Sequence, residues 1–338
     1  MLYPLIFEPL LIPMVWGGER ILSYKGLAEG PEKVGESWEV SAVPGRESTV
    51  ASGSLRGRSL PSLVEEFKGA LVGKSVYERF GGEFPLLVKF IDASGDLSIQ
   101  VHPDDEMARR VHGKPFGKTE MWYVMDSAPE AHLYSGFSRE ITPREYDSLV
   151  ASGKIVDVLT DHPVKEGDVF FIPAGRVHAI CAGTFLAEIQ QSGDLTYRVF
   201  DYNRPGLDGK PRQLHTALAR EALDYKVYPS YRTDYEPAVD KKVPLVECNC
   251  FTTDLYVLDA PLNIPLEDLD SFLVVMCMEG ECVLEDSEPL FGPDGLPTAT
   301  KGHVVRLGRG TTVLVPATSR GITLKPASPL VKILTSHC

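Results

Sequence analysis

The stretch GDVFFIPAGRVH, residues 167–178, decides the fold class of this chain. A glycine precedes a short apolar run, Pro-Ala-Gly forms a turn, and His178 stands on the apolar run that follows. Residues 310–321, GTTVLVPATSRG, repeat this spacing but carry Gly321 at the position of the histidine. Two unrelated strand-turn units would also explain so short a repeat. The shared spacing favours a duplicated barrel whose second copy has lost the polar residue.

The sequence around these two copies is mostly short β-rich runs separated by proline and glycine, and helical patterns are few. Helices are predicted over about 60–80, after Pro103, around 214–223, and from Thr142, where a Thr-x-x-Glu capping box precedes a proline. We therefore predict a mainly β protein, a barrel or sandwich with helical insertions. The polar, proline-containing stretch 225–243 separates the two copies.

Composition restricts the class of protein and of partner. A chain of 338 residues is long enough for two compact cores, and 43% hydrophobic with 24% charged residues is typical of globular proteins. No apolar run approaches the roughly 20 residues of a membrane helix, and the apolar start carries Glu8 and no basic leader. We therefore expect neither a membrane partner nor a signal peptide.

Cysteine usage and net charge add two further expectations. None of the six cysteines forms a Cys-x-x-Cys pair, which favours buried free thiols in a reducing, cytoplasmic compartment. The net charge of −13 argues against a nucleic-acid partner, whose phosphates the average surface would repel. A small anionic substrate would need lysine and arginine side chains gathered in one local pocket.

Polar residues recur at regular intervals in otherwise apolar strands. In LSIQVH, strict alternation places Ser98, Gln100 and His102 on one face of a strand. Lys118 and Glu120 share a face of the next predicted strand in the same way. Burying such groups without partners is costly, and a metal ion inside a barrel would supply the partner.

Four of these polar residues offer a plausible ligand set for a divalent metal. Two imidazole nitrogens and two oxygens suit zinc or a neighbouring ion, and come from His102, His178, Glu120 and Gln100. Singly, each is more simply a structural strand residue, but together with the histidine motif they favour a metal site. Three cations, Lys89, Lys118 and Arg198, are each an ordinary surface or strand charge when taken singly. Grouped near a metal, they would form the expected basic pocket.

The motif G-x5-P-x-G-x2-H resembles the second conserved motif of cupin barrels. Further stretches resemble those of type I phosphomannose isomerases in their short bacterial form: SIQVHPDD (98–105), GKTEMWYV (117–124), PAGRVHAI (173–180) and QQSGDLTYRVFDYNR (190–204). The resemblance covers essentially the whole chain. It implies tandem cupin-like (jelly-roll) β-barrels with helical insertions, namely a catalytic metal-binding barrel over 1–225 and a degenerate barrel without metal over 226–338.

The same resemblance implies a zinc-dependent aldose–ketose isomerase with one zinc ion per chain. Its substrates would be mannose 6-phosphate and fructose 6-phosphate, interconverted by proton transfer through a cis-enediol. The family's zinc ligands fall on Gln100, His102, Glu120 and His178. Its catalytic positions fall on Arg198, Lys118 and Glu188, and its substrate-binding positions on Lys89, Ser98 and, as a weaker match, Glu36.

The role of each catalytic group follows in part from its charge. Arg198 is permanently charged, so we expect it to stabilise the enediolate, and we expect a partner anion for it on its strand. The general base stays open between Glu188, Lys118 and metal-bound water.

Two other functions remain open from the residues alone. Two histidines and a carboxylate also suit the non-haem iron of an oxidative cupin. Gln100 as a fourth ligand and the nearby cations count against it. The second alternative is a non-catalytic sugar-binding regulator, against which the complete ligand set and Arg198 argue. The sequence does not indicate an oligomeric state.

Overall fold

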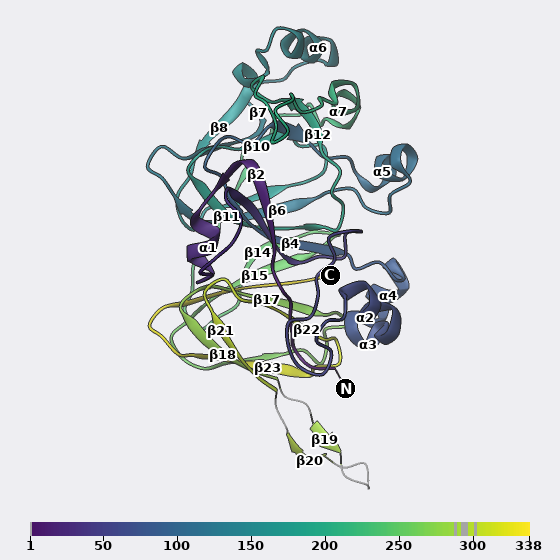
Figure 1. Ribbon diagram of the computed structural model, residues 1–338, viewed down its shortest axis with the longest axis vertical. Helices are drawn as coiled ribbons and strands as arrows, with labels where there is room; N and C mark the ends of the chain where they lie inside the picture. Colours follow the sequence, from purple (N-terminus) through teal and green to yellow (C-terminus); the bar gives the residue numbers. More distant parts are fainter. Residues whose placement is uncertain (1, 287–288, 292–296, 301–302) are drawn as a thin grey trace. The chain divides into compact units, whose positions relative to one another are not determined.

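The computed structural model describes residues 2–286, 289–291, 297–300 and 303–338. Antiparallel strands dominate it and the helices are short, so the mainly β prediction is confirmed (Figure 1). Its contacts divide the chain into two compact units, each made of separate segments. Unit 1 comprises Met1–Pro9, Glu39–Pro85 and Asp234–Cys338, and unit 2 comprises Leu10–Trp38 and Leu86–Thr233. No helix of the described residues is long and apolar enough to cross a membrane.

Unit 2 is a sandwich of two antiparallel sheets. The larger has the order β13-β9-β6-β11-β4-β3-β2 and the smaller β12-β5-β10-β7-β8. The larger sheet is formed by β2 (Leu10–Gly18), β3 (Val34–Val40), β4 (Leu86–Asp92), β6 (Glu120–Ser127), β9 (Val169–Ile172), β11 (Thr184–Gln191) and β13 (Arg232–Thr233). The smaller is formed by β5 (Ile99–Val101), β7 (His132–Phe137), β8 (Leu159–Pro163), β10 (His178–Ile180) and β12 (Tyr197–Phe200).

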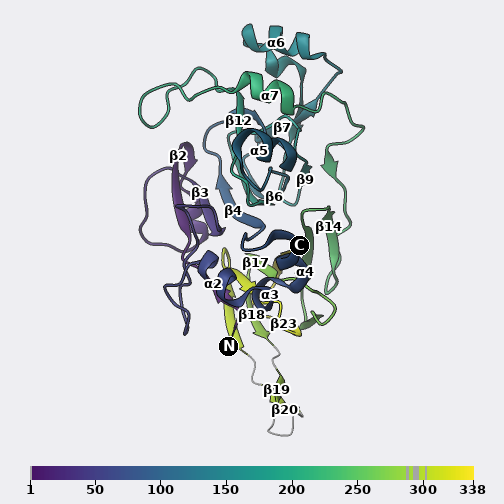
Figure 2. The same cartoon turned by 90° about the vertical axis from the view of Figure 1, so that its right-hand side faces the viewer.

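Alternation along the strands of the smaller sheet separates its two faces. Ile99 and Val101 of β5 pack into a core with residues of the unit's helices, which lie beside β7 and β12 (Figures 1 and 2). These helices are α5 (Asp105–His112), α6 (Pro143–Ala151), η1 (Ile155–Val158) and α7 (Thr216–Ala222), and α1 (Arg20–Tyr24) follows β2. The other face meets the larger sheet, where Leu133 and Ile180 join Trp122 in a second core. Gln100 is on that inner face.

Unit 1 is a second sandwich, with the sheet orders β1-β22-β17-β24-β15-β14 and β16-β23-β18-β21. The first sheet is formed by β1 (Leu5–Ile6), β14 (Val243–Glu247), β15 (Thr252–Leu258), β17 (Leu273–Glu279), β22 (Thr312–Val315) and β24 (Val331–His337). The second is formed by β16 (Leu262–Pro265), β18 (Glu281–Asp286), β21 (His303–Gly308) and β23 (Gly321–Pro326); β19 (Pro289–Phe291) pairs with β20 (Pro297–Thr300). Aliphatic residues of both sheets share one core.

Unit 1 also takes in segments from the first quarter of the chain, which differs from the predicted division after residue 225. Strand β1 pairs with β22, and α2 (Leu60–Phe67), α3 (Gly69–Val72) and α4 (Lys74–Phe80) lie beside the C-terminal strands (Figures 1 and 2). The carboxylate of Asp270 accepts the backbone N–H groups of Lys74 (2.7 Å) and Ser75 (2.8 Å) at the start of α4. These contacts are non-local, so no composition shift marks them. The assignment of metal-binding and metal-free domains to 1–225 and 226–338 stays a prediction.

The helix expected over 60–80 is interrupted at two backbone positions. Lys68 has φ 48° and Gly73 has φ 98°, and a helix cannot continue through either conformation. The capping box behaves as predicted, because the Thr142 hydroxyl accepts the N–H of Glu145 at the start of α6. Segment 105–112 is the helix expected after Pro103.

The repeated motif folds alike in the two units. The first copy forms β9, a turn and β10, and the second forms β22, a turn and β23. The glycine that begins each copy has a positive φ, 87° at Gly167 and 82° at Gly310. This agreement supports the tandem-barrel interpretation of the repeat.

Candidate metal centre and active-site cavity

Three of the four predicted metal ligands come together inside unit 2. His102 directly follows β5, Glu120 begins β6, and His178 begins β10, so the two sheets contribute facing groups. One potential ligand atom from each of the three lies within 4.8 Å of the others. All three side chains are at most 1% exposed. The fourth, Gln100, is paired with His178 across β5 and β10.

Backbone carbonyls fix how the two histidines present their rings. Nδ1 of His102 lies 2.8 Å from the Leu195 carbonyl, and Nδ1 of His178 lies 2.8 Å from the Arg176 carbonyl. Because a carbonyl can only accept, each Nδ1 carries the proton, and each Nε2 keeps its lone pair. Metal-bound histidines are typically held in this way by a second hydrogen bond.

Several buried polar atoms at this centre have no hydrogen bond among the described residues. They are His102 Nε2 and both carboxylate oxygens of Glu120, although Lys118 Nζ lies 2.6 Å from Glu120 Oε2 as an ion pair. Glu120 Oε1 is 3.3 Å from His178 Nε2. Buried polar atoms rarely stay unpaired, and a cation between these lone pairs would satisfy them together. The residues present therefore fit a divalent metal ion.

The amide of Gln100 borders the same centre. Its Nε2 is 3.3 Å from His178 Nε2, and its Oε1 is 3.3 Å from the Ser98 hydroxyl. The two ends of an amide have nearly the same shape, and a half-turn about its last bond would place Oε1 beside His178. Gln100 can thus offer an oxygen to an ion held by the other three.

Burial sets the protonation of these groups in the absence of a cation. It lowers the pKa of His178 to about 3 and that of His102 well below its usual value, so both rings are neutral at neutral pH. Burial likewise raises the pKa of Glu120 to about 8. Neutral imidazoles are the form that binds metals, and a nearby cation favours the carboxylate.

A buried ion-pair cluster adjoins the candidate metal ligands. Glu188 on β11 is 3.0 Å from Lys89 Nζ on β4 and 3.5 Å from Lys118 Nζ, and it accepts the Trp122 indole N–H at 3.1 Å. Glu36 on β3 lies 3.6 Å from Lys89 Nζ. Four of the predicted catalytic and substrate-binding charges therefore meet in one place, drawn from three strands and the segment before β6.

The cations decide the charge state of Glu188. Burial favours its protonated form, but the ammonium groups of Lys118 and Lys89 outweigh burial and hold its pKa at about 2. For Lys89, burial alone would lower the pKa, and the carboxylates of Glu188 and Glu36 raise it instead. Both groups are thus charged at neutral pH.

Arg198 lies on β12 at the side of this cluster. Its guanidinium donates to the Ser98 hydroxyl at 3.3 Å and to the Gln213 carbonyl at 2.9 Å. The partner anion expected from the sequence is wrong for the described residues, where Arg198 forms no ion pair. The side chain is only half-buried, so neutral acceptors and solvent suffice. Among the described residues no carboxylate forms an ion pair with Arg198, since nearby Asp201 pairs with Arg204 and Arg212.

A cavity of about 110 Å³ is lined by all six predicted catalytic and substrate-binding residues. It is lined by Met14, Trp16, Glu36, Lys89, Ile91, Leu97, Ser98, Gln100, Lys118, Ile180, Glu188, Thr196, Arg198 and Arg212. Gln100 and Lys118 connect it to the candidate metal ligands, which lie behind the lining.

Sequence reasoning missed Arg212 and Thr196 in this cavity. Arg212 contacts both carboxylate oxygens of Asp201, at 2.7 and 2.6 Å. It belongs to a loop without periodicity or motif, so no signal in the sequence could have singled it out. Only the folding of that loop beside β12 places a second arginine next to Arg198.

Comparison with known proteins gives the site its context. Residues 13–131 match the family described as phosphomannose isomerase type I, catalytic domain. A probable mannose-6-phosphate isomerase of Bacillus subtilis (strain 168), GmuF, is 40% identical over 226 residues, which are 66% of this chain and 69% of that protein. The chain belongs to the mannose-6-phosphate isomerase family. The matched region includes Gln100, His102 and Glu120.

Solved structures of this family have the same fold. The mannose 6-phosphate isomerase of Bacillus subtilis aligns with a TM-score of 0.85 at 29% identity over the full length of both chains. A zinc-bound mannose 6-phosphate isomerase aligns with a TM-score of 0.76 over 98% of this chain and 99% of that one. At 16% identity, this second likeness concerns the fold alone. The tandem cupin-like architecture expected from the sequence is thus confirmed.

Proposed function

We propose that this enzyme interconverts mannose 6-phosphate and fructose 6-phosphate with the help of one zinc ion. Family membership gives the class of reaction, and one observation carries the assignment to these residues. That observation is the buried group of His102, Glu120 and His178, in which His102 Nε2 and both Glu120 oxygens have no hydrogen bond among the described residues, directly beside a cavity lined by four cations. The cations supply the basic pocket that a sugar phosphate needs in a chain of net charge −13.

In this proposal, Gln100, His102, Glu120 and His178 hold the metal. Nitrogen and oxygen ligands of this kind suit zinc, with Glu120 as the only anionic ligand. When bound, zinc supplies a positive charge that polarises a sugar oxygen. The Leu195 and Arg176 carbonyls hold the Nδ1 protons of His102 and His178, so the Nε2 lone pair of each ring can bind an ion.

The chain's own charges then act on the open-chain sugar. Proton transfer between C1 and C2 develops negative charge on the enediolate oxygens, and Arg198 stabilises it because no carboxylate among the described residues neutralises the guanidinium. Lys118 donates a proton to one of these oxygens. Glu188 takes the proton from one carbon and returns it to the other, and as a carboxylate it also holds the ammonium groups of Lys118 and Lys89 in position.

The remaining cavity residues orient the substrate in this proposal. Ser98 already bonds Arg198 and Gln100, so its hydroxyl links the proposed catalytic cation to a proposed metal ligand. Lys89 and Glu36 form one wall, where the indole of Trp38 donates to Glu36 at 2.6 Å. Arg212, which also lines the cavity, provides positive charge for the phosphate.

The proposal also covers the second unit and the compartment. We assign no metal to unit 1, because its copy of the motif carries Gly321 at the position of His178. All six cysteines are free thiols in the structure, which supports a reducing, cytoplasmic compartment.

A coupled assay tests the function directly. The purified protein should convert mannose 6-phosphate to fructose 6-phosphate, lose that activity after chelation and dialysis, and regain it with stoichiometric zinc. Oxygen consumption that depends on iron would instead support an oxidative cupin. Bound sugar phosphate without turnover in the zinc-loaded protein would support a non-catalytic binder.

A further inference from the structure

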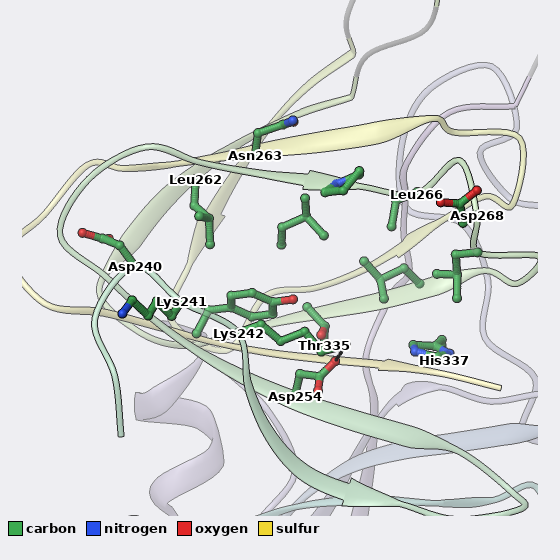
Figure 3. A pocket seen from close by; sticks show the side chains of 15 residues that line it. Asp240, Lys241, Lys242, Asp254, Leu262, Asn263, Leu266, Asp268, Thr335 and His337 are labelled. Carbon is green, nitrogen blue, oxygen red and sulfur yellow. Dashed lines mark ion pairs between the residues drawn. The ribbon is translucent and has the colours of Figure 1, made fainter. Parts of the chain in front are cut away.

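Unit 1 contains a cavity of about 570 Å³ that the proposed isomerase reaction does not use. Its lining comes from the strands β15, β17 and β24 of one sheet and β16 of the other, and from the segments 240–242 and 266–269 (Figure 3). Its size falls within the range of about 300–1,000 Å³ typical of small-molecule sites, which often occupy the mouths of β-barrels. The cavity is therefore a candidate binding site in the barrel that has lost its metal motif.

One wall of this cavity is apolar. Leu262 and Leu266 project from β16 and the residues after it toward the cavity, facing Asp254, Thr335 and His337 on the opposite wall (Figure 3). Ile264, Pro265 and Leu269 complete this wall, and Leu273 of β17 adds an aliphatic side chain from the opposite sheet. Such a surface suits the C–H face of a ring or a short carbon chain.

The opposite wall carries a buried acid in a position where a barrel core is usually apolar. Asp254 lies two residues before Tyr256 on β15, so the two side chains are on the same face of the strand. Tyr256 belongs to the core of the unit, and Asp254 therefore also points into the barrel. Asp254 is 2% exposed, and its Oδ2 lies 2.9 Å from Lys242 Nζ. Its Oδ1 has no hydrogen-bond partner among the described residues. A buried carboxylate oxygen of this kind needs a donor, and a ligand hydroxyl can provide one.

Two more polar groups border the same wall. Thr335 is directly opposite Asp254 on the neighbouring strand β24, and His337 lies two residues further on the same face. Burial lowers the pKa of His337, so its ring is neutral at neutral pH. The wall thus offers a charged acceptor, a hydroxyl and a neutral imidazole side by side.

The charges around the cavity restrict the ligand. Three carboxylates line it, Asp240, Asp254 and Asp268, against two ammonium groups, Lys241 and Lys242. This excess of negative charge disfavours a phosphate or carboxylate ligand, while the two lysines disfavour a cation. A neutral ligand with several hydroxyl groups and an apolar face meets both conditions.

We propose that this cavity binds a neutral polyhydroxylated small molecule of about hexose size. A hydroxyl of the ligand donates to Asp254 Oδ1, and other hydroxyls reach Thr335 and His337. The C–H face of the ligand packs on Leu262, Leu266 and their aliphatic neighbours. The site is separate from the proposed isomerase centre and does not depend on its assignment.

Methyl NMR of the full-length, zinc-loaded protein tests the proposal with D-mannose as the probe. Saturable shifts are expected at the methyl groups of Ile264, Leu266 and Leu273, whereas Ile91 and Ile180 report any binding at the isomerase cavity. Inorganic phosphate should leave the first three unchanged. Absence of saturable shifts at these three methyl groups, or tighter binding of phosphate there, overturns the proposal.

Two variants make the test independent of one substitution. Asp254→Asn keeps the shape of the side chain and should weaken mannose binding at least tenfold, and Ile264→Trp should fill the cavity and abolish it. Both should retain the coupled isomerase activity. Asp268→Ala, a matched change of a lining carboxylate outside the polar wall, should bind nearly as the wild type does. Unchanged mannose binding in both of the first two variants refutes the site.

Discussion

Replacing Arg198 by alanine should reduce turnover far more than it weakens substrate binding. The guanidinium lies beside the cavity with two hydrogen bonds and no ion pair among the described residues, so its charge is available to the developing enediolate. Loss of one preorganised donor of this kind typically costs about 100- to 1,000-fold in kcat, or roughly 2.7–4 kcal/mol of transition-state stabilisation. Because the ground-state sugar carries less charge at these atoms, KM should change less.

The same substitution has a separate and smaller effect on stability. It removes the hydrogen bonds to Ser98 and to the Gln213 carbonyl, each worth about 0.5–1.5 kcal/mol, so the free energy of unfolding should fall by roughly 1–3 kcal/mol. Arg198→Lys should recover only part of the lost turnover, because lysine keeps the charge without the planar fork. Zinc content should stay stoichiometric in both variants.

Steady-state kinetics on the folded, zinc-loaded variants measure these effects. Arg204→Ala is a matched control, since Arg204 pairs with Asp201 at 2.9 Å nearby but does not line the cavity, and its kcat should stay near the wild-type value. A phosphate clip would instead raise KM and leave kcat intact. A well-folded Arg198→Ala enzyme with near-normal kcat would therefore refute the catalytic assignment.

Three further predictions follow from the described contacts. His178→Ala should lose both zinc, by elemental analysis, and activity, whereas His162→Ala should keep both; stoichiometric zinc in the first variant would contradict the ligand assignment. Glu188→Gln removes the carboxylate that Lys89 and Lys118 share and leaves them only Glu36 and Glu120, so stability should fall by about 3 kcal/mol in chemical denaturation, with lower kcat. An unchanged denaturation midpoint would contradict this prediction. Thr142→Ala removes the N-cap bond of α6 and should cost about 1 kcal/mol with kcat unchanged; a fall in kcat would link this helix to the site.

Several features of the molecule could be predicted from local sequence because local physics determines them. Alternation in LSIQVH places Gln100 on the inner face of β5, since side chains of a strand point to opposite sides whatever the partner strand. The capping box at Thr142 and the two copies of the glycine–proline motif likewise depend on backbone conformation within a few residues.

The resemblance to a known family indicated which charged residues belong to one site, and the spacing of the residues alone did not. Glu188 and Lys89 are 99 positions apart, and nothing local shows that β11 and β4 are neighbours in register. The sequence identifies these charged residues but does not show that Glu188 is ionised. Its pKa depends on the distances to two ammonium groups, which only the folded chain sets.

Only the tertiary structure decided which distant segments share a core or a cavity. Arg212 reaches the proposed site from a loop, residues 39–85 join the C-terminal strands, and Asp254 faces a cavity in the second barrel. Each of these depends on contacts between segments far apart in the chain. Such contacts depend on how the side chains of both sheets pack together, and no short stretch of sequence determines that packing.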